Sequence, residues 1–252
     1  MKNKQKYIIT PSELARVVNK TMAGVSKSFD KSETLNLSGR RVGIPWKLTK
    51  KYLEQHGADF SFKVISHINL RGGVSKTSSS CHLASRAAQY GHKVALLDLD
   101  SQASSSLTFG VSADDKNKIF LDIYKTPKKI NSSMAEIQEN FFILPSSLDN
   151  GLLDSSLSNQ PQLQKEAVKN VCMELKKAGF SLVVIDVSPS LSAGVISTIC
   201  ASDIITIPVQ SDMFSMKGLS LTINESKQIS KTFGLPLPEL KILFNKYDGR
   251  EK

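Results

Sequence analysis

The sequence is poor in cysteine, in long apolar runs and in acidic residues. Its three cysteines, Cys81, Cys172 and Cys200, are odd in number and widely spaced, which argues against disulfides or a cysteine metal site. No run of about 18 apolar residues is present, so no transmembrane helix is expected. The basic N-terminus is not followed by an apolar signal core, so export is not expected either. These absences predict a cytoplasmic protein with reduced thiols and no membrane contact.

The excess of basic over acidic residues is concentrated near the N-terminus. The chain has 33 Lys and Arg against 23 Asp and Glu, for a net charge of +10. Residues 1–60 contain 12 basic and 5 acidic residues, whereas the remainder carries 21 and 18. A basic segment on a nearly neutral body predicts a nucleic-acid-binding module at residues 1–60, although ordinary solubilising lysines are an alternative. Hydrophobic residues make up 40% of the whole chain. Residues 61–252 are therefore numerous and apolar enough to form one α/β domain with its own core.

The most informative stretch is Arg-Gly-Gly-Val-Ser-Lys-Thr at residues 71–77, directly after the apolar run 62–70. A buried strand that turns through glycines into a helix aims backbone N–H groups and a helix N-terminus at one point, which favours phosphate. In such a loop Lys76 reaches the β- and γ-phosphates, and the Thr77 hydroxyl binds Mg²⁺. The predicted nucleotide-binding residues of the loop are Gly72, Gly73, Val74, Ser75, Lys76, Thr77 and Ser78.

The loop resembles the deviant Walker A box, KGG-x-GK[ST], of the ParA/MinD family of partition and positioning ATPases. Arg71 stands at the position of the family's first lysine, and Ser75 stands at the position of its last glycine. Glycine there lets the backbone approach phosphate and adopt conformations that other residues reach only at a cost. If Ser75 is strained, the cost is about 1–3 kcal/mol. We therefore predict weakened nucleotide binding or slow hydrolysis with an intact fold.

Two further apolar runs end in acidic residues. Residues 94–100 end in Asp98 and Asp100, which we expect to point to the same side of a strand. Residues 182–186 end in Asp186. The two runs resemble the family's Walker A′ box, D-x-D-P-Q, and its Walker B box. The resemblance implies that Asp100 orients the attacking water, Asp98 supports the Mg²⁺ shell and Asp186 holds Mg²⁺ through water. Helix capping is the alternative role for Asp98 and Asp100.

The remaining pattern alternates strands with helices. We expect strands at residues 204–209 and 240–244 and a helix at 213–232. Residues 245–250 resemble the family's T-x-Y-D-x-R segment, which implies that Asn245 lies near the adenine. The alternation predicts an α/β fold with a doubly wound, mostly parallel sheet of the P-loop NTPase type. Ligands of such sheets bind beyond the carboxyl ends of the strands.

The N-terminal segment reads as a set of short helices. Thr10, Pro11 and Glu13 form a helix-start signal. A turn at residues 19–24, a second helix from Val25 to Phe29, a basic turn at 38–45 and a helix at 46–56 follow. This order resembles the winged helix-turn-helix heads of plasmid-type ParA proteins. The candidate DNA contacts are Lys27, Lys31, Arg40 and Arg41, for which a solvated turn is the alternative.

The resemblance, which covers residues 62–250, also implies a mechanism, cofactors and partners. Family members form ATP-dependent homodimers in which two subunits sandwich two ATP molecules. Arg71 would cross to the partner's phosphates, and Arg71, Lys76 and Asp100 would be the catalytic residues. The implied cofactors are ATP and Mg²⁺, and the implied partners are DNA, a ParB-like protein and a second copy of the chain. The implied process is plasmid or chromosome partition in the bacterial cytoplasm, with association with the nucleoid.

A different class of function remains open. The chain would then be a DNA-binding transcriptional regulator with a degenerate or ligand-sensing nucleotide site. Ser75 favours this reading, as does the end of the chain at Lys252, before the strand and basic helices with which the family usually continues. A MinD-type membrane positioner would need a C-terminal amphipathic helix, which the pattern does not show. The cysteines do not fit a nitrogenase-type iron–sulfur ATPase.

Overall fold

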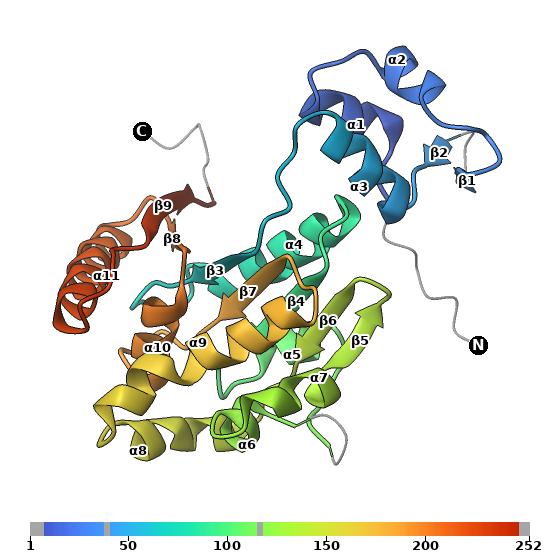
Figure 1. The fold of residues 1–252 in the computed structure, drawn as a ribbon. Coiled ribbons are helices and arrows are strands. Elements are labelled where there is room, and N and C mark those ends of the chain that lie inside the picture. Colours follow the sequence, from blue (N-terminus) through green and yellow to red (C-terminus); the bar gives the residue numbers. More distant parts are fainter. Residues whose placement is uncertain (1–7, 38–40, 115–117, 247–252) are drawn as a thin grey trace.

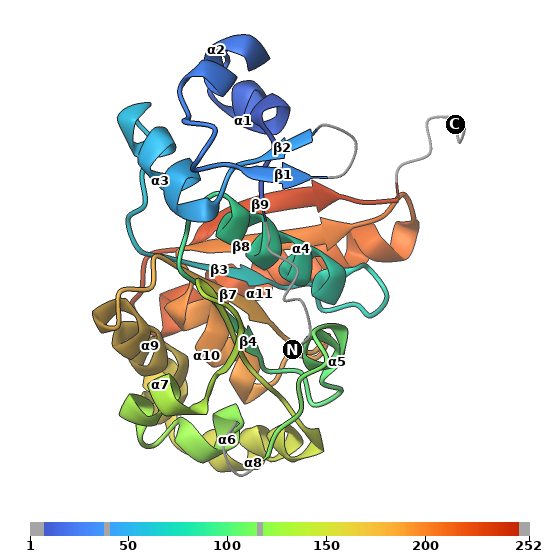
Figure 2. The same ribbon diagram turned by 90° about the vertical axis from the view of Figure 1, so that its right-hand side faces the viewer.

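The computed structural model describes residues 8–37, 41–114 and 118–246, which form two parts (Figure 1). Residues 8–56 make a small head of short helices and a two-stranded sheet. Residues 63–246 make a larger body around a seven-stranded sheet. Figure 2 shows the same arrangement from the side, with the head projecting from one end of the body.

The strands of the body follow the order β5-β6-β4-β7-β3-β8-β9. Neighbouring strands are parallel except for β5 and β6, which are antiparallel. This arrangement confirms the predicted doubly wound, mostly parallel sheet. The strands are β3 (Lys63–His67), β4 (Val94–Asp98), β5 (Ala135–Gln138), β6 (Phe141–Leu144), β7 (Leu182–Asp186), β8 (Ile204–Val209) and β9 (Glu239–Phe244).

Helices cover both faces of the sheet. One face lies under α4 (Lys76–Gln89), and the other lies under α9 (Pro161–Lys177), α10 (Ala193–Ala201) and α11 (Met213–Thr232). Alternate residues of each central strand enter different cores. Leu96 packs with Ala84 of α4, whereas its neighbour Leu97 packs with Val171 of α9. Strands covered on both faces need continuous apolar runs, which explains the composition of β4 and β7.

The hairpin of β5 and β6 was not predicted from the sequence. Each strand has only four residues, and the register shifts between Glu136 and Gln138. Residues 135–138 do alternate apolar and polar side chains, but four residues are too few to indicate a strand by themselves. Pairing of β6 with the fully buried β4, and of β5 with β6, stabilises this short hairpin at the edge of the sheet.

Short helices connect the strands of this half of the body. They lie between β4 and α9 in the sequence, and α6 and α8 lie at the lower end of the molecule in Figure 1. They are α5 (Ser104–Thr108), α6 (Phe120–Ile123), η2 (Pro127–Lys129), α7 (Ile130–Ser133), η3 (Leu148–Leu152) and α8 (Leu153–Leu157).

The head contains α1 (Pro11–Val17), α2 (Met22–Lys27), β1 (Leu35–Leu37), β2 (Arg41–Gly43) and α3 (Trp46–Gln55). The start signal of α1 is confirmed, because Thr10 and Glu13 form a capping box. The expected start of the second helix at Val25 is wrong. Thr21 caps α2 by accepting a hydrogen bond from Gly24 N at 3.1 Å, so the helix includes residues assigned to the turn. Strands β1 and β2 pair antiparallel, and β2 lies within residues 38–45, where the sequence analysis predicted a basic turn.

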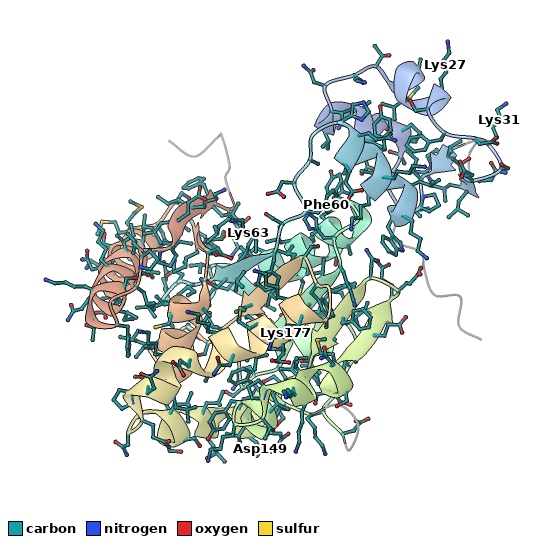
Figure 3. All side chains as sticks on the ribbon, in the orientation of Figure 1. Lys27, Lys31, Phe60, Lys63, Asp149 and Lys177 are labelled. Carbon is teal, nitrogen blue, oxygen red and sulfur yellow. The ribbon has the colours of Figure 1, made fainter. Side chains whose placement is uncertain are left out.

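The head is fastened to the C-terminal end of α4. Tyr90 and Phe60 extend the hydrophobic core of the head toward the body. Arg86 of α4 donates a hydrogen bond to Glu13 of α1 at 3.2 Å and another to the Tyr90 hydroxyl at 3.0 Å. Phe60 also stacks against His92 with ring centroids 4.5 Å apart, and it lies at the junction in Figure 3. Apolar packing and an ion pair therefore hold the head at one end of α4.

The cysteines are free thiols, as predicted. Cys81 and Cys172 are buried, and Cys200 is half-buried. Burial raises the pKa of the Cys172 thiol to about 12, which keeps it protonated and unreactive. Within the described ranges, no helix combines the length and the apolar character that crossing a membrane requires.

A glycine at the junction of head and body provides a test of their contact. Gly91 has φ +100°, and a Cβ there would lie 2.4 Å from Lys50 Cβ of α3. We predict that Gly91→Ala lowers the free energy of unfolding by the cost of a left-handed alanine, about 1–2 kcal/mol, and by a further penalty for overpacking of about 1–3 kcal/mol. Urea unfolding monitored by circular dichroism measures this difference.

Gly179 is the matched control for Gly91. It also follows a long helix and has φ +80°, but a Cβ there would meet no atom within 4 Å. Gly179→Ala should therefore lower the free energy of unfolding only by the cost of the left-handed alanine. Equal losses in the two variants would show that the head does not press on Gly91.

Candidate nucleotide and metal site

The predicted phosphate loop joins β3 to α4 at the carboxyl end of a central strand. β3 ends at His67, earlier than the apolar run to residue 70 suggests, and Lys76 is the first residue of α4. Gly73 has φ +77°, in the region that favours glycine. A Cβ on either Gly72 or Gly73 would meet nothing within 4 Å outside the adjacent residues. The outer side of the loop is therefore open, as a phosphate cradle requires.

Side chains that follow β3 and β8 hold the base of the loop. Buried Asn69 donates from Nδ2 to the carbonyl of Pro208 at 2.7 Å, and its Oδ1 accepts from Arg71 N at 3.0 Å. Gln210 donates from Nε2 to the Gly73 carbonyl at 2.7 Å. A Cβ on Gly218 of α11 would lie 2.6 Å from Asn69 Oδ1, so a larger residue there would displace the amide. The loop is thus fixed by residues distant in sequence.

Ser75 has a left-handed backbone conformation, which a residue other than glycine adopts only at a cost. Its φ of +73° and ψ of +32° place it at the N-cap position of α4, and its side chain makes no capping hydrogen bond. Left-handed geometry costs a residue other than glycine about 1–2 kcal/mol. Ala103, the N-cap residue of α5, has a similar conformation with φ +54°. The chain therefore stores backbone strain at two turns around the same site.

The Lys76 side chain folds back over the loop. Its Nζ donates to the Arg71 carbonyl at 2.9 Å, and the residue is 7% exposed. Burial lowers the pKa of the Lys76 ammonium, while the nearby carboxylates of Asp186 and Asp100 oppose this shift. A buried cation with one neutral partner is poorly compensated, and an anionic ligand would compensate it further.

The remaining loop residues lie around Lys76. Val74 is buried, so it offers its backbone to a ligand, whereas Ser78 is exposed in the first turn of α4. The Thr77 side chain lies near enough to Asp186 to lower the pKa of its carboxyl group. This proximity brings together the hydroxyl and the carboxylate that the sequence analysis assigned to Mg²⁺.

Asp98 and Asp186 end adjacent strands and lie opposite each other in the sheet register. Asp186 accepts a hydrogen bond from Ser105 Oγ at 2.7 Å. Asp98 accepts from Ser106 N at 2.8 Å and from Ser106 Oγ at 2.7 Å. Burial raises the pKa of both carboxyl groups, that of Asp98 to about 7, while these hydrogen bonds oppose the rise.

Asp100 lies beyond the strand on which it was predicted. β4 ends two residues earlier, at Asp98, so the alternation of side chains along a strand does not apply to Asp100. Asp100 is 9% exposed, and its Oδ1 accepts from Gln102 N at 3.0 Å. Its charge nevertheless acts on Lys76 and Asp186. The turn, rather than the strand, brings Asp100 to the site.

The oxygen donors of this site fit Mg²⁺. Carboxylate and hydroxyl oxygens suit a hard cation, and Asp186 and Thr77 provide one of each. In the parts of the chain that the structure covers, no group of three or more His, Cys, Asp or Glu side chains could hold a metal by itself. Mg²⁺ usually retains waters and shares phosphate oxygens rather than occupying an all-protein cage. The residues thus suit a cation that arrives with a phosphate ligand.

Arg71 is held within its own chain. Its guanidinium donates to the Asp212 carboxylate and to Ser215 Oγ, the latter at 3.0 Å, and lies 5.4 Å from the centroid of the Phe214 ring. Asp212 is also the N-cap residue of α11. Arg71 must leave these partners before it can contact another subunit.

The other predicted site residues lie further away. Asn245 follows β9, and its N donates to the Val209 carbonyl at 2.8 Å, two strands from β3. Lys27, Lys31 and Arg41 are exposed on the head, and Figure 3 shows Lys27 and Lys31 at its outer end. Arg40 lies outside the described residues. The structure thus separates the nucleotide site from the candidate DNA contacts.

Sequence reasoning missed Ser105, Asp212 and Asn69, which contact predicted site residues. Each is a common polar residue outside a recognised motif. Ser105 contacts Asp186 of β7, Asp212 contacts Arg71, and Asn69 contacts Pro208 of β8, so each contact joins segments far apart in the chain. It also missed His67, the last residue of β3 and the register neighbour of Asp186. Burial lowers the pKa of His67 to about 4, and among the described residues its Nδ1 has no hydrogen-bond partner.

Comparisons with known proteins agree with this geometry. Residues 62–241 match a family model described as an AAA domain. The sporulation initiation inhibitor protein Soj of Bacillus subtilis is 28% identical over 189 residues, covering 75% of this chain and 74% of Soj. The chromosome-partitioning ATPase Soj of Thermus thermophilus is 27% identical over 186 residues, covering 74% and 70%.

A solved structure shares the fold of the body. Cobyrinic acid a,c-diamide synthase from Mycobacterium smegmatis, with a bound ATP analogue and magnesium, superposes with a TM-score of 0.68 at 22% identity. The match covers 75% of this chain and 74% of the synthase. A biosynthetic enzyme therefore has the same fold, so the fold alone does not distinguish between functions.

The strain at Ser75 generates a prediction. Relief of left-handed strain gains about 1–2 kcal/mol, and the greater freedom of unfolded glycine removes roughly 0.4–1 kcal/mol of that gain. Ser75→Gly should therefore raise the free energy of unfolding by about 0.5–1 kcal/mol. It should also tighten binding of Mg²⁺–ATP in calorimetry, because the loop backbone relaxes toward phosphate.

Ala103→Gly is the control, because it relieves similar strain outside the loop. It should gain similar stability in urea unfolding without tightening ATP binding. If Ser75→Gly gains neither stability nor affinity, the serine does not weaken the site.

Proposed function

This chain belongs to the AAA domain family and, within it, to the ParA/MinD group of partition ATPases; we propose that it binds Mg²⁺–ATP, dimerises on ATP, hydrolyses it and acts in plasmid or chromosome partition. The observation that carries the proposal is the meeting of Lys76, Thr77 and Asp186 at one edge of the sheet. These residues come from separate motifs and supply the cation, hydroxyl and carboxylate that a nucleotide site needs.

The residues divide the work of binding as follows. The backbone of residues 72–75, with Lys76, holds the phosphates, and the Asn69 amide keeps the loop in position. Thr77 and Asp186 would hold Mg²⁺, and Asp98 would support this shell from the adjacent strand. Mg²⁺ held there would supply positive charge to offset that of the phosphoryl group. Asp100 orients the attacking water, and Asn245 lies toward the adenine.

Exposed apolar side chains support dimerisation through this face. They lie on segments that follow the carboxyl ends of β4, β6, β7 and β8, close in the fold to the phosphate loop. Large exposed apolar residues rimming a site are typical of protein interfaces. They are Leu107, Leu148, Leu152, Leu191, Met213, Phe214 and Met216.

Arg71 has a separate role in this proposal. It stands where the family has a lysine that reaches the partner subunit, and a guanidinium offers a planar fork for phosphate oxygens. Its pairing with Asp212 holds it in the monomer, so dimerisation exchanges one anionic partner for another. Arg71 then stabilises charge on the phosphoryl group of the partner's ATP.

The head is the proposed DNA-binding module. Residues 1–60 carry most of the excess positive charge, and Lys27 and Lys31 project from the side of the head that faces away from the body (Figure 3). Exposed lysines on such a surface contact phosphates without reading sequence. We propose that a ParB-like protein stimulates hydrolysis and that the protein works in the cytoplasm, on the nucleoid.

The second candidate, a DNA-binding regulator with a ligand-sensing nucleotide site, is favoured by the left-handed Ser75. It differs from the ATPase in one measurable respect. A regulator binds nucleotide without turnover, whereas the ATPase releases phosphate when DNA and the partner protein are present.

Dimerisation tests the proposed function. We predict that the wild-type chain shifts toward dimer with Mg²⁺–ATP in size-exclusion chromatography with light scattering. Asp100→Ala should accumulate the dimer, because hydrolysis no longer dissolves it. Arg71→Ala should bind ATP in calorimetry yet remain monomeric. Asp212→Asn retains a helix-capping side chain and frees Arg71, so it should dimerise at a protein concentration lower by roughly two- to fivefold.

Two results would count against this function. If the wild-type chain and Asp100→Ala both stay monomeric with Mg²⁺–ATP, ATP-driven dimerisation is wrong. If Arg71→Ala dimerises and turns over normally, Arg71 has no role in the partner's site.

DNA binding by the head is tested through its salt dependence. We predict that Lys27→Ala with Lys31→Ala lowers duplex affinity and reduces the slope of log affinity against log salt by about 2, since each phosphate contact contributes about 1. Fluorescence anisotropy at several salt concentrations measures the slope. Lys176→Ala with Lys177→Ala, on the body, is the matched control, and Lys177 is marked in Figure 3. An unchanged slope in the head variant would place DNA elsewhere.

A further inference from the structure

The first turn of α5 contacts both buried acids of the site. It begins after Ala103, whose left-handed conformation turns the chain from β4 back over the sheet. Ser105 and Ser106 follow and are both buried. Ser105 Oγ donates to Asp186 Oδ2, whereas Ser106 donates to Asp98 Oδ2. Adjacent serines therefore bind acids on adjacent strands, one each.

The orientation of the Ser105 hydroxyl is determined by its two partners. Its proton is directed to Asp186 Oδ2 at 2.7 Å, and its oxygen accepts the Cys81 thiol proton at 3.4 Å. Ser105 is 0% exposed, so no bulk water competes for these bonds. A hydroxyl with a fixed donor direction also fixes the rotation of the carboxylate that it meets.

The other oxygen of Asp186 faces the start of α4. Among the described residues, the hydrogen bond to Asp186 Oδ1 is a long one from Ser80 Oγ, at 3.4 Å, and the nearby Thr77 side chain lowers the pKa of this carboxyl group. Ser105 thus holds one oxygen from the α5 side and leaves the carboxylate turned toward the hydroxyl predicted to bind the metal. This division of the two oxygens is a common arrangement for metal-binding carboxylates.

We infer that Ser105 is a positioning residue, which fixes the Asp186 carboxylate in the orientation that receives Mg²⁺ with the nucleotide. The inference rests on the proposed function, because it concerns the Mg²⁺ of the same site. Ser105 touches neither nucleotide nor metal and acts only through Asp186. It affects the gain in nucleotide affinity that Mg²⁺ provides, and it leaves the Mg²⁺-free affinity to the loop and Lys76.

The competing explanation is that Ser105 only packs the interior. Loss of packing would lower stability and weaken nucleotide binding to the same extent with and without Mg²⁺. The ratio of the two affinities separates the explanations, because a purely structural role does not change it.

The experiment measures binding of ADP and of a non-hydrolysable ATP analogue by calorimetry, in Mg²⁺ and in EDTA, on the full chain. Ser105→Ala should reduce the affinity gain from Mg²⁺ by about tenfold, the usual scale for residues that orient a metal ligand. Its affinity in EDTA should stay within about twofold of wild type. Ser104→Ala, the same substitution one residue earlier, should keep the full gain, because Ser104 contacts neither acid in the hydrogen bonds of this turn.

A second variant covers the case in which Ser105→Ala does not fold. Ser105→Cys keeps nearly the same volume but offers a much weaker donor, and it should also lose most of the Mg²⁺ gain. Circular dichroism shows which variants are folded. A folded Ser105→Ala or Ser105→Cys with the wild-type Mg²⁺ gain would overturn the inference and leave the proposed function intact. Failure of the wild-type chain to bind nucleotide even in Mg²⁺ would overturn both.

Discussion

Charges buried together at one edge of a parallel sheet are the constraint on which the rest of this structure depends. Lys76, Asp98, Asp100 and Asp186 are each at most 9% exposed. Charges removed from water destabilise a fold by several kcal/mol unless hydrogen bonds or opposite charges compensate them. The hydroxyl groups and loop carbonyls around them provide that compensation here. The serines at the start of α5 are therefore part of the site, and a nucleotide with Mg²⁺ would complete the compensation.

Helix α4 connects this site to the head. Its first residue, Lys76, belongs to the phosphate loop, and Arg86 near its end binds Glu13 of the head. Fourteen residues of helix span about 21 Å, so one rigid element separates the proposed nucleotide and DNA contacts. The head packs against Tyr90 and Gly91 just beyond that helix. Its position relative to the nucleotide site is consequently set by packing rather than by a flexible linker.

Sequence reasoning succeeded where structure depends on neighbouring residues. The strands that end in Asp98 and Asp186 are continuous apolar runs, and helix α11 has the predicted bounds, Met213–Thr232. It failed for the β5–β6 hairpin, which is stabilised by its neighbours rather than by its own pattern. It also placed Asp100 on the strand, although β4 ends two residues earlier, at Asp98. The partner of Arg71 lies 141 residues away and has no local signal.

The order of residues alone determined the fold class, the strand–loop–helix unit around Lys76 and the chemical types gathered at the site. These features follow from apolar periodicity and turn residues, whose physical effects act within a few positions of the chain. Only the tertiary structure decided which side chains meet. Strand order brought Ser105 to Asp186 and Asp212 to Arg71, and packing with Tyr90 and the bond from Arg86 to Glu13 placed the head at the far end of α4. Such pairings depend on how the sheet is assembled, and no short stretch of sequence encodes that assembly.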